Sequence, residues 1–444
     1  MTSSSPAFLR VAQITPGAGK MYCGACLRDN ALVKALRGLG HSATMIPLYL
    51  PLTLDEPDQS AGTPTFYGGI NVYLAQQSAF FRRAPAWLRN LLAAPALLKM
   101  AAGPAARTRP ESLGDITLSM LRGEEGHQAR ELEELILWLR REKPDVVCLS
   151  NALLVGMARR LRSELRVPIL CNLQGEDWFL DSLPAASRDQ AWHTVAARAA
   201  DVDLFIAPSR YFASLMQKRL RLPAERVRVL HNGINLDGFH PSAHPPRHPH
   251  SPPTLGYFAR MCREKGLENL VDAFVILKKR DQVKNLKLRV GGSCGPVDQV
   301  LVDQLRARLA EAGVAADAEF LPNPPRAAKL QFLSSLSVFS VPATYSEAFG
   351  LYVIEALAAG IPVVQPGHSA FPELIAATGG GLVCPPHDPG ALAAAIESLL
   401  ADPPRARALG EAGRKAVAEK FSVERMAREM AGIFADAIQR FSHS

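Results

Sequence analysis

The sequence lacks the features of a secreted or membrane-spanning protein. Its 7 cysteines in 444 residues are scattered and odd in number, so they do not form a disulfide framework. The first ten residues have neither the charged start nor the long apolar run of a secretory signal. The most apolar long window, 86–106, is interrupted by Arg89, Pro95, Lys99 and Pro104, so it does not read as a spanning helix. We therefore expect a cytoplasmic protein.

The composition is that of an ordinary globular protein with an excess of positive charge. Apolar residues make up 48% and charged residues 21% of the chain, and the formal net charge is +8. This charge favours anionic partners such as nucleotide phosphates or acidic lipid headgroups. A basic motif with stacking aromatics and a recognition helix are both lacking, so nucleic acid is not an expected partner.

Short apolar runs alternate with longer helical patterns along the chain, and this rhythm restarts after residue 253. Such alternation predicts parallel sheets with crossover helices, so we expect two doubly wound, Rossmann-like α/β domains. The strands are expected at 9–14, 43–49, 146–149, 168–173, 203–207, 255–259, 286–290, 338–341, 362–365 and 381–384.

The expected domain boundary is a Pro- and His-rich stretch. Residues 239–253 have no helical or strand period and are interpreted as a linker or surface loop. An N-terminal domain, 1–238, and a C-terminal domain, 254–421, would then flank a central cleft. Because the carboxyl ends of strands face such a cleft, it is the expected ligand site.

The N-terminal domain contains an expected basic helical insertion at about 80–142. Its stretch 80–110 carries six basic and no acidic residues, together with several large apolar side chains. One interpretation is a pair of solvated helices packed on the domain. The other is a surface that rests on an anionic membrane or binds a lipid-linked acceptor, which would make the protein peripheral at the cytoplasmic membrane face.

The segment from Glu347 to Glu355 combines two carboxylates with the start of a helix. Unpaired N–H groups and the helix dipole at Gly350 and Leu351 favour a phosphate. The glutamates can accept hydrogen bonds from sugar and ribose hydroxyls. Two glutamates at this spacing are weak evidence alone, because acidic residues are common near helix N-termini.

Two cations in the same domain strengthen this interpretation. Arg260 follows an expected strand and Lys265 precedes an expected helix, so both could reach one anion. Either residue alone would be taken for an ordinary surface charge. Combined with the Glu347–Glu355 segment, they predict a site for a diphosphate.

With these motifs, the chain resembles the retaining nucleotide-sugar glycosyltransferases of family four, which have the two-domain GT-B fold. The resemblance extends over nearly the whole chain. It includes 229–236, 355–364, Phe371-Pro-Glu373 and 381–383. The stretch 422–444 resembles the C-terminal helix that crosses back to the N-terminal domain in this family.

The resemblance implies roles for the matched residues. Arg260 and Lys265 would bind the donor pyrophosphate and stabilise the leaving nucleoside diphosphate. Glu347 would contact the transferred sugar and Glu355 the ribose, while Phe349, Gly350 and Leu351 would present backbone groups. Family members need no metal ion and no other cofactor, because the nucleoside-diphosphate sugar is a co-substrate.

The N-terminal domain matches the family less closely. Gly17 and Gly19 occupy the place of a glycine-rich loop near the donor phosphates, although simple turn glycines remain an alternative. Gln174 stands where the family commonly has a histidine. A glutamine can orient a hydroxyl but cannot exchange a proton near neutral pH. Glu176 and Asp177 are candidates for contacts to the acceptor.

The pair Cys23 and Cys26 does not predict a metal site. A second cysteine pair and a histidine pair at zinc spacing are both missing from the sequence. Small side chains in a tight loop are the simpler interpretation.

The function expected from these observations is the transfer of a sugar, with retention of configuration, from a nucleoside-diphosphate sugar to a hydroxyl acceptor. Polysaccharide, glycolipid or other glycoconjugate synthesis would use this reaction. A nucleotide-sugar isomerase or epimerase on the same architecture is an alternative, since a fold does not determine a reaction. A non-catalytic protein that binds anionic ligands is a third hypothesis.

Overall fold

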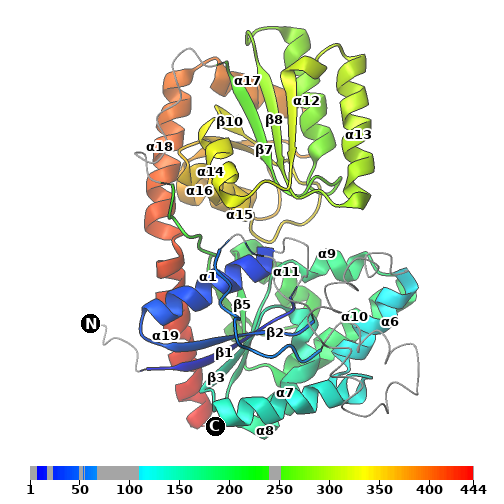
Figure 1. The fold of residues 1–444 in the computed structure, drawn as a ribbon, viewed down its shortest axis with the longest axis vertical. Coiled ribbons are helices and arrows are strands. Elements are labelled where there is room, and N and C mark those ends of the chain that lie inside the picture. The colour runs from blue at the N-terminus through cyan, green and yellow to red at the C-terminus, as the bar shows by residue number, and fades with distance from the viewer. Residues whose placement is uncertain are drawn as a thin grey trace. The chain divides into compact units, whose positions relative to one another are not determined.

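The chain folds into two compact units, each built around a parallel β-sheet (Figure 1). The first unit consists of Met1–His231 with Met426–Ser444, and the second consists of Asn232–Arg425. Residues 80–109 of the basic stretch and most of the Pro- and His-rich stretch lie outside the described residues. The computed structural model describes residues 8–17, 24–49, 54, 56–67, 110–239 and 252–443.

The sheet of the first unit has six parallel strands in the order β2-β1-β3-β4-β5-β6. Its central strands β3 and β4 are buried at every position, as expected where helices cover both faces of a parallel sheet. The strands are β1 (Arg10–Thr15), β2 (Ser42–Pro47), β3 (Val146–Leu149), β4 (Ile169–Asn172), β5 (Leu204–Ala207) and β6 (Val227–Val229).

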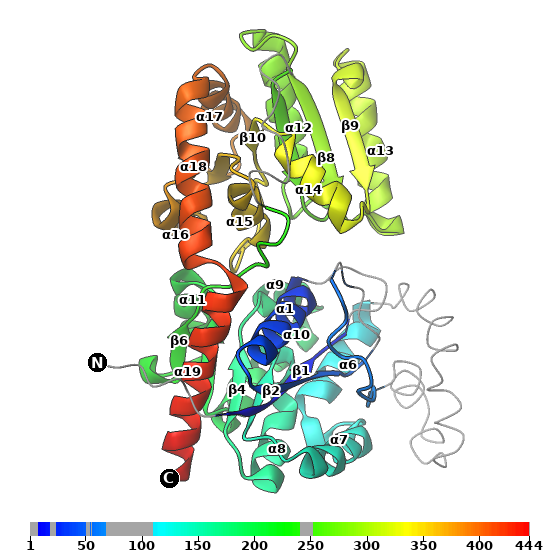
Figure 2. The same cartoon turned by 60° about the vertical axis from the view of Figure 1, so that its left-hand side comes forward.

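Helices surround this sheet, as both views of the chain show (Figure 1, Figure 2). The C-terminal helix α19 begins in the second unit and continues in the first, where Met426–Ser444 belong. The α-helices are α1 (Gly24–Gly38), α6 (Pro110–Leu121), α7 (Ala129–Glu142), α8 (Ala158–Leu165), α9 (Glu176–Asp181), α10 (Ala185–Arg198), α11 (Arg210–Leu220) and α19 (Val423–Ser442). Short 3-10 helices span Gly123–Glu125, Ala152–Met157, Ala199–Asp201 and Ala224–Arg226.

The second sheet also has six parallel strands, in the order β12-β11-β10-β7-β8-β9. These strands are β7 (Thr254–Phe258), β8 (Lys287–Gly292), β9 (Ala318–Pro322), β10 (Val338–Phe339), β11 (Val363–Pro366) and β12 (Gly381–Cys384). The α-helices are α12 (Leu267–Arg280), α13 (Pro296–Glu311), α14 (Arg326–Ser334), α15 (Leu351–Ala358), α16 (Phe371–Thr378), α17 (Pro389–Leu400) and α18 (Pro403–Lys420), and a 3-10 turn spans Ala315–Asp317. The expected fold of two doubly wound α/β domains is confirmed.

Two strands were not expected from the sequence, and both lie at the edge of a sheet. Strand β6 is the last strand of the first sheet, and β9 is the last strand of the second. Most of their residues are exposed or only partly buried. These two strands therefore lack the continuous apolar run by which the other strands were recognised.

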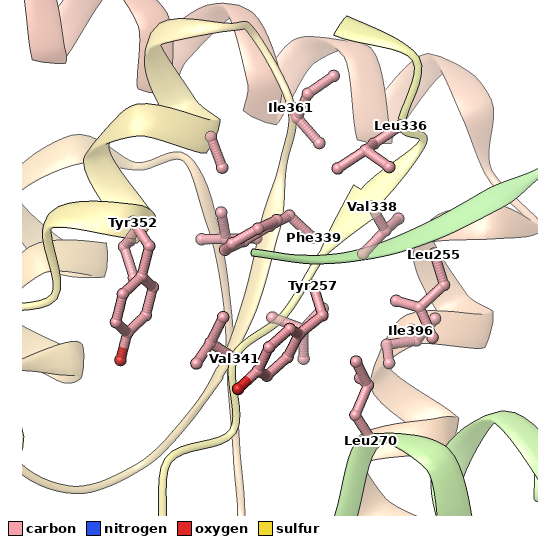
Figure 3. Close-up of a cluster of buried hydrophobic side chains, with 14 of the residues drawn as sticks. Leu255, Tyr257, Leu270, Leu336, Val338, Phe339, Val341, Tyr352, Ile361 and Ile396 are labelled. Carbon is pink, nitrogen blue, oxygen red and sulfur yellow. The ribbon is translucent and has the colours of Figure 1, made fainter. Parts of the chain in front are cut away.

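The core of the second unit holds the strand ends in place. Figure 3 shows part of this cluster, in which Tyr257 of β7, Phe339 of β10 and Tyr352 of α15 lie close together. Tyr257 and Phe339 are 0% exposed and Tyr352 is 8% exposed. Their backbones are therefore fixed by packing, which gives the loops that follow β7 and β10 a rigid base.

Gly266 is a position where no side chain fits, and we predict that Gly266→Ala destabilises the second unit. Its φ is +70°, and a Cβ there would lie 1.8 Å from the carbonyl oxygen of Pro342. Gly313 is the matched control, because its φ is +72° and nothing lies within 4 Å of a Cβ. We expect Gly313→Ala to cost about 1 kcal/mol and Gly266→Ala at least about 3 kcal/mol, measured by thermal unfolding followed by circular dichroism. Equal losses would contradict the predicted clash.

Candidate functional site

The second sheet has its topological switch point between β7 and β10. From β7 the chain adds β8 and β9 on one side, and it then returns to add β10, β11 and β12 on the other. In open α/β sheets, ligands bind beyond the carboxyl ends of the strands at such a point. Arg260 follows β7 there, and Glu347 and Gly350 lie between β10 and α15.

Lys265 and Glu347 are in direct contact beside this switch point, although 82 residues separate them. The distance from Lys265 Nζ to Glu347 Oε2 is 2.6 Å, and only 19% and 11% of the two side chains are exposed. The ammonium also lies over the rings of Tyr345 and Tyr352, at 4.8 and 5.0 Å from their centroids. The tertiary structure thus holds Lys265 in one place, unlike an ordinary surface lysine.

Three donors converge on a single oxygen of Glu347. Besides Lys265, the hydroxyls of Tyr352 and Tyr345 donate to Oε2 at 2.7 and 2.9 Å. Burial alone would raise the pKa of Glu347, but the charge of Lys265 and the three hydrogen bonds outweigh it and hold that pKa below its usual value. Glu347 is therefore a carboxylate at neutral pH.

Arg260 forms an ion pair with Asp298, a residue that the sequence did not single out. Arg260 Nε lies 3.0 Å from Asp298 Oδ2, and Nη2 lies 3.0 Å from Oδ1. Asp298 also accepts the backbone N–H of Gly295 at the start of α13, at 3.1 Å. The Asp298 carboxylate raises the pKa of Arg260, and half of the Arg260 side chain is exposed. The ion pair therefore orients the Arg260 guanidinium, whose remaining N–H groups can donate to a ligand.

The start of α15 presents backbone rather than side chains. Gly350 precedes the helix with φ +95° and Leu351 is its first residue, so the first N–H groups of the helix lack intrahelical acceptors. The side chain of Phe349 is 3% exposed and packs against Phe421, with ring centroids 6.1 Å apart. The Phe349 side chain is therefore not available to a ligand, and its backbone is the part that can contact a bound donor.

Glu355 lies one turn into α15 and is held by Lys329 of α14. Lys329 Nζ donates to Glu355 Oε1, and 11% and 18% of the two side chains are exposed. Among the described residues, Glu355 Oε2 has no hydrogen-bond partner. Both glutamates of the segment are thus held by a lysine through one oxygen. The role of Glu355 at the ribose stays a prediction.

In the first unit, Gln174, Glu176 and Asp177 follow β4 at the carboxyl edge of the sheet. Glu176 accepts the backbone N–H of Gln174 through Oε2 at 2.8 Å and that of Ala152 through Oε1 at 2.7 Å. Glu176 is 4% exposed, so it braces the loop that carries Gln174. Asp177 is 3% exposed, and its Oδ1 has no hydrogen-bond partner within the described residues.

Of the two glycines expected near the donor phosphates, Gly17 is among the described residues and Gly19 is not. Gly17 follows β1 with φ +78°, a conformation that glycine adopts without strain. Gly19 and Cys23 lie outside the described residues, whereas Cys26 is buried in α1. The role of this loop stays a prediction.

Burial raises the pKa of Glu176 to about 7, and we predict a pH dependence of stability from it. A carboxyl with a raised folded-state pKa contributes stability at low pH, and this contribution is lost as the pH rises through about 7. We expect the first unit to lose on the order of 3 kcal/mol between pH 4 and 8 in the wild type and clearly less in Glu176→Gln.

Tryptophan fluorescence can follow this unfolding separately, because all 4 tryptophans of the sequence lie before residue 193. Burial also raises the pKa of Asp177, to about 6. Asp177 is present in both proteins, so it changes the pH dependence of their stability in the same direction. The same loss of stability in the wild type and in Glu176→Gln would contradict the assignment to Glu176.

A buried polar cluster at the carboxyl ends of β1 and β4 was not predicted from the sequence. Arg28 Nη1 pairs with Asp29 Oδ1 at 3.0 Å, and 1% and 0% of the two side chains are exposed. Thr15 at the end of β1 donates to Asp29 at 2.9 Å, and Arg28 donates to Asn172 at the end of β4 at 3.1 Å. The cluster ties α1 to the ends of β1 and β4. The adjacent Arg28 and Asp29 near the start of α1 are the signal that could have revealed it.

Neither a metal cluster nor a membrane span is found in the part of the chain that the structure describes. Within that part, no three His, Cys, Asp or Glu side chains gather in a way that could hold a metal ion. None of the described helices is both long and apolar enough to cross a bilayer.

Two family profiles match consecutive parts of the chain. Residues 101–237 match the profile described as Glycosyltransferase Family 4, and residues 242–416 match the profile described as Glycosyl transferases group 1. Together they cover most of both units. The resemblance expected from the motifs is confirmed.

A curated relative and two solved structures agree with these matches. The D-inositol 3-phosphate glycosyltransferase of Corynebacterium aurimucosum is 32% identical over 41% of this chain and 43% of that protein. The chain spans about half the length of the curated relatives it matches first.

Among solved structures, sucrose-phosphate synthase of Thermosynechococcus elongatus has a TM-score of 0.72 at 22% identity and covers 98% of this chain and 100% of its own. Anabaena HepE, solved in complex with UDP-glucose, has a TM-score of 0.65 at 15% identity and covers 96% and 100%. These structures share the fold of the chain.

Proposed function

Because this chain belongs to the family-four glycosyltransferases with the GT-B fold, we propose that it transfers a sugar from a nucleoside-diphosphate sugar to a hydroxyl acceptor with retention of configuration. The observation that carries the proposal is the contact of Lys265 with Glu347 beside the switch point of the second sheet. It places a cation for the diphosphate next to a carboxylate for the sugar.

In the proposed reaction, the bond between the sugar C1 and the diphosphate oxygen breaks, and a bond from C1 to the acceptor oxygen forms. The nucleoside diphosphate leaves with the bonding electrons, so its negative charge grows in the transition state. Arg260 and Lys265 stabilise that charge from fixed positions, which is more effective than stabilisation by mobile water. With two cations for this task, the proposal requires no metal ion.

The two glutamates would hold the rest of the donor. Glu347 is a carboxylate and accepts a hydroxyl of the transferred sugar, while Glu355 accepts from the ribose through Oε2. The N–H groups at Gly350 and Leu351 bind a phosphate oxygen at the start of α15. The acceptor hydroxyl is oriented by Gln174, whose loop Glu176 braces, with Asp177 as a second candidate. The proton of that hydroxyl leaves with the diphosphate or to solvent.

The first experiment identifies the donor by its effect on thermal stability. UDP-, GDP- and ADP-sugars are compared, because a ligand that binds only the folded protein raises its melting temperature by mass action. UDP-glucose is included as the ligand named for the HepE structure. The proposal expects one nucleotide class to raise the melting temperature well above the others, and a panel without any shift contradicts it.

The second experiment tests transfer itself by measuring free nucleoside diphosphate. Acceptors include inositol phosphate, hexose phosphates, oligosaccharides and lipid-linked sugars, the first because a relative is named for it. Release that depends on an added acceptor supports transfer. An isomerase or epimerase would change the donor sugar without releasing the nucleotide, and a non-catalytic protein would only bind it.

We place the reaction in the cytoplasm. The cysteines of the described residues are free thiols, as is usual where glutathione keeps thiols reduced. A role of the basic stretch 80–110 at an anionic membrane is a separate hypothesis from the sequence. Sedimentation with neutral and anionic liposomes tests it.

A further inference from the structure

The two oxygens of the Glu347 carboxylate have different surroundings. Oε2 accepts from Lys265, Tyr352 and Tyr345 at 2.6, 2.7 and 2.9 Å. Oε1 accepts no hydrogen bond from the described residues. Because a carboxylate oxygen has two lone pairs, Oε2 is fully used, and Oε1 is the oxygen that can accept from a ligand.

Tyr352 is the most deeply buried of the three donors. Its ring packs between Phe339 and Phe371, each with its centroid 6.4 Å away, and the residue is 8% exposed. Figure 3 shows this ring beside the hydrophobic cluster, with the hydroxyl at its outer end. A tyrosine packed in this way has lost its rotamer freedom on folding, so its hydroxyl keeps Oε2 in place at little further entropic cost.

Lys265 alone could not hold the carboxylate through a reaction. Of its three N–H donors, one is directed to Glu347 and another to the hydroxyl of Tyr345 at 2.5 Å. When a diphosphate binds, its negative charge attracts the same ammonium. The hydroxyl of Tyr352 is neutral and has no such competing demand, so its hold on Oε2 persists when the donor is bound.

We propose that Tyr352 is a positioning residue for the donor sugar, because it holds Oε2 of Glu347 so that Oε1 accepts a sugar hydroxyl. The inference rests on the proposed function and deepens it by assigning the sugar contact to one oxygen and its orientation to a tyrosine. Tyr345 has a supporting role, since its hydroxyl contacts the same oxygen and also Lys265. Tyr352 lies inside the Glu347–Glu355 segment and Tyr345 just before it, but the motif assigned a role to neither.

The test is Tyr352→Phe, which removes the hydroxyl and keeps the ring below Lys265. Dissociation constants are measured by calorimetry for the nucleoside diphosphate and for its sugar, using the nucleotide that most stabilises the wild type. The ratio of the two constants isolates the contribution of the sugar. We expect the diphosphate to bind within about twofold of wild type and the sugar contribution to fall by about tenfold.

The pH dependence of the same ratio provides a second readout, which a merely structural role would not change. The sugar contribution is lost when Glu347 is protonated, and without the Tyr352 hydroxyl the carboxylate loses a donor that favours its charged form. The acid midpoint is therefore expected at higher pH in Tyr352→Phe. Lys265, Tyr345 and His368, whose pKa is affected by Glu347, are unchanged in this variant.

Tyr257→Phe is the matched control, because Tyr257 is also buried in this unit and its hydroxyl donates to the backbone oxygen of Arg260 at 2.6 Å. It should leave the sugar contribution and its midpoint unchanged. In Glu347→Gln, adding Tyr352→Phe should cause no further loss of the sugar contribution.

An unchanged ratio and midpoint in Tyr352→Phe would overturn the inference. Should this variant not fold, Tyr345→Phe removes another donor from Oε2, and an unchanged midpoint there overturns the inference equally. If the proposed function itself is wrong, the wild type binds no nucleotide sugar more tightly than the bare nucleotide. This result concerns the wild type and is therefore distinct from an unchanged ratio or midpoint in the two variants.

Discussion

Lys265→Met is expected to lower kcat/KM for sugar transfer by about 10² to 10³, the cost of removing one group that stabilises charge in a transition state. The methionine replaces the apolar part of the lysine side chain and removes the ammonium that contacts Glu347 at 2.6 Å. Most of the loss should appear in kcat, because the diphosphate carries more negative charge in the transition state than in the bound donor.

The same variant should change how stability depends on pH. In the wild type the pKa of Glu347 is lowered, chiefly by the charge of Lys265 acting against burial. A lowered pKa adds stability above the pKa of the unfolded chain, and this stability is lost as the pH falls through the folded-state value. Without Lys265 that contribution disappears, and the buried carboxylate destabilises the second unit at neutral pH instead.

Lys278→Met is the control for this prediction. Lys278 also has 19% of its side chain exposed and contacts a carboxylate, that of Asp317, at 2.7 Å. Asp317 directly precedes β9, the edge strand of the second sheet, at the amino end of that strand and therefore away from the switch point. We expect Lys278→Met to reduce stability and to leave transfer within about twofold of wild type. Transfer by Lys265→Met at more than about a third of the wild-type rate would rule out its proposed role.

Arg260→Ala is expected to have the second-largest effect, a loss of about 10² to 10³ in kcat/KM. Arg260 is held by Asp298 through Nε and Nη2, so its remaining N–H groups have a defined direction towards the donor. Arg260→Lys should recover only part of the activity, because a lysine cannot make the same two-point contact with Asp298. The stability cost should be moderate, since half of the Arg260 side chain is exposed but the Asp298 side chain, 7% exposed, loses its counter-ion.

Arg263→Ala is the matched control for Arg260→Ala. Arg263 lies three residues further along, has 61% of its side chain exposed and pairs with Glu268 at 2.8 Å. Steady-state kinetics should show wild-type values within about twofold for this variant. A similar loss in both variants would indicate a general effect of positive charge and would contradict a specific site at Arg260.

The fold could be predicted from the sequence where strands are buried. Residues 146–149 were expected as a strand with the bounds that the buried strand β3 has. The edge strand β12 was also expected with its observed bounds, because residues 381–384 form an apolar run although only Cys384 is buried. The edge strands β6 and β9 could not be predicted, because a charged residue interrupts each apolar run, Arg228 in β6 and Glu319 in β9. Amphipathic helices such as α7 were recognisable because one side of the helix is apolar and the other is charged.

The site could be predicted only where its residues are neighbours in the sequence. Glu347, Gly350 and Glu355 form a continuous motif, and Arg260 and Lys265 form another. Their partners could not be found in this way. Asp298 looks like an ordinary acidic residue in the first turn of a helix, where such residues are common for local reasons. In the sequence, Tyr352 looks like an ordinary apolar position of one helix, and Lys329 looks like an ordinary charged position of another.

The sequence by itself determined that the chain has two parallel α/β sheets, that it carries a glycosyltransferase motif, and which cations and carboxylates could act. Only the tertiary structure decided which cation meets which carboxylate. It joined Lys265 to Glu347, Lys329 to Glu355 and Arg260 to Asp298. The reason is physical: these pairs form between loops and helices far apart in the chain, and burial among packed side chains makes each charge depend on its partner.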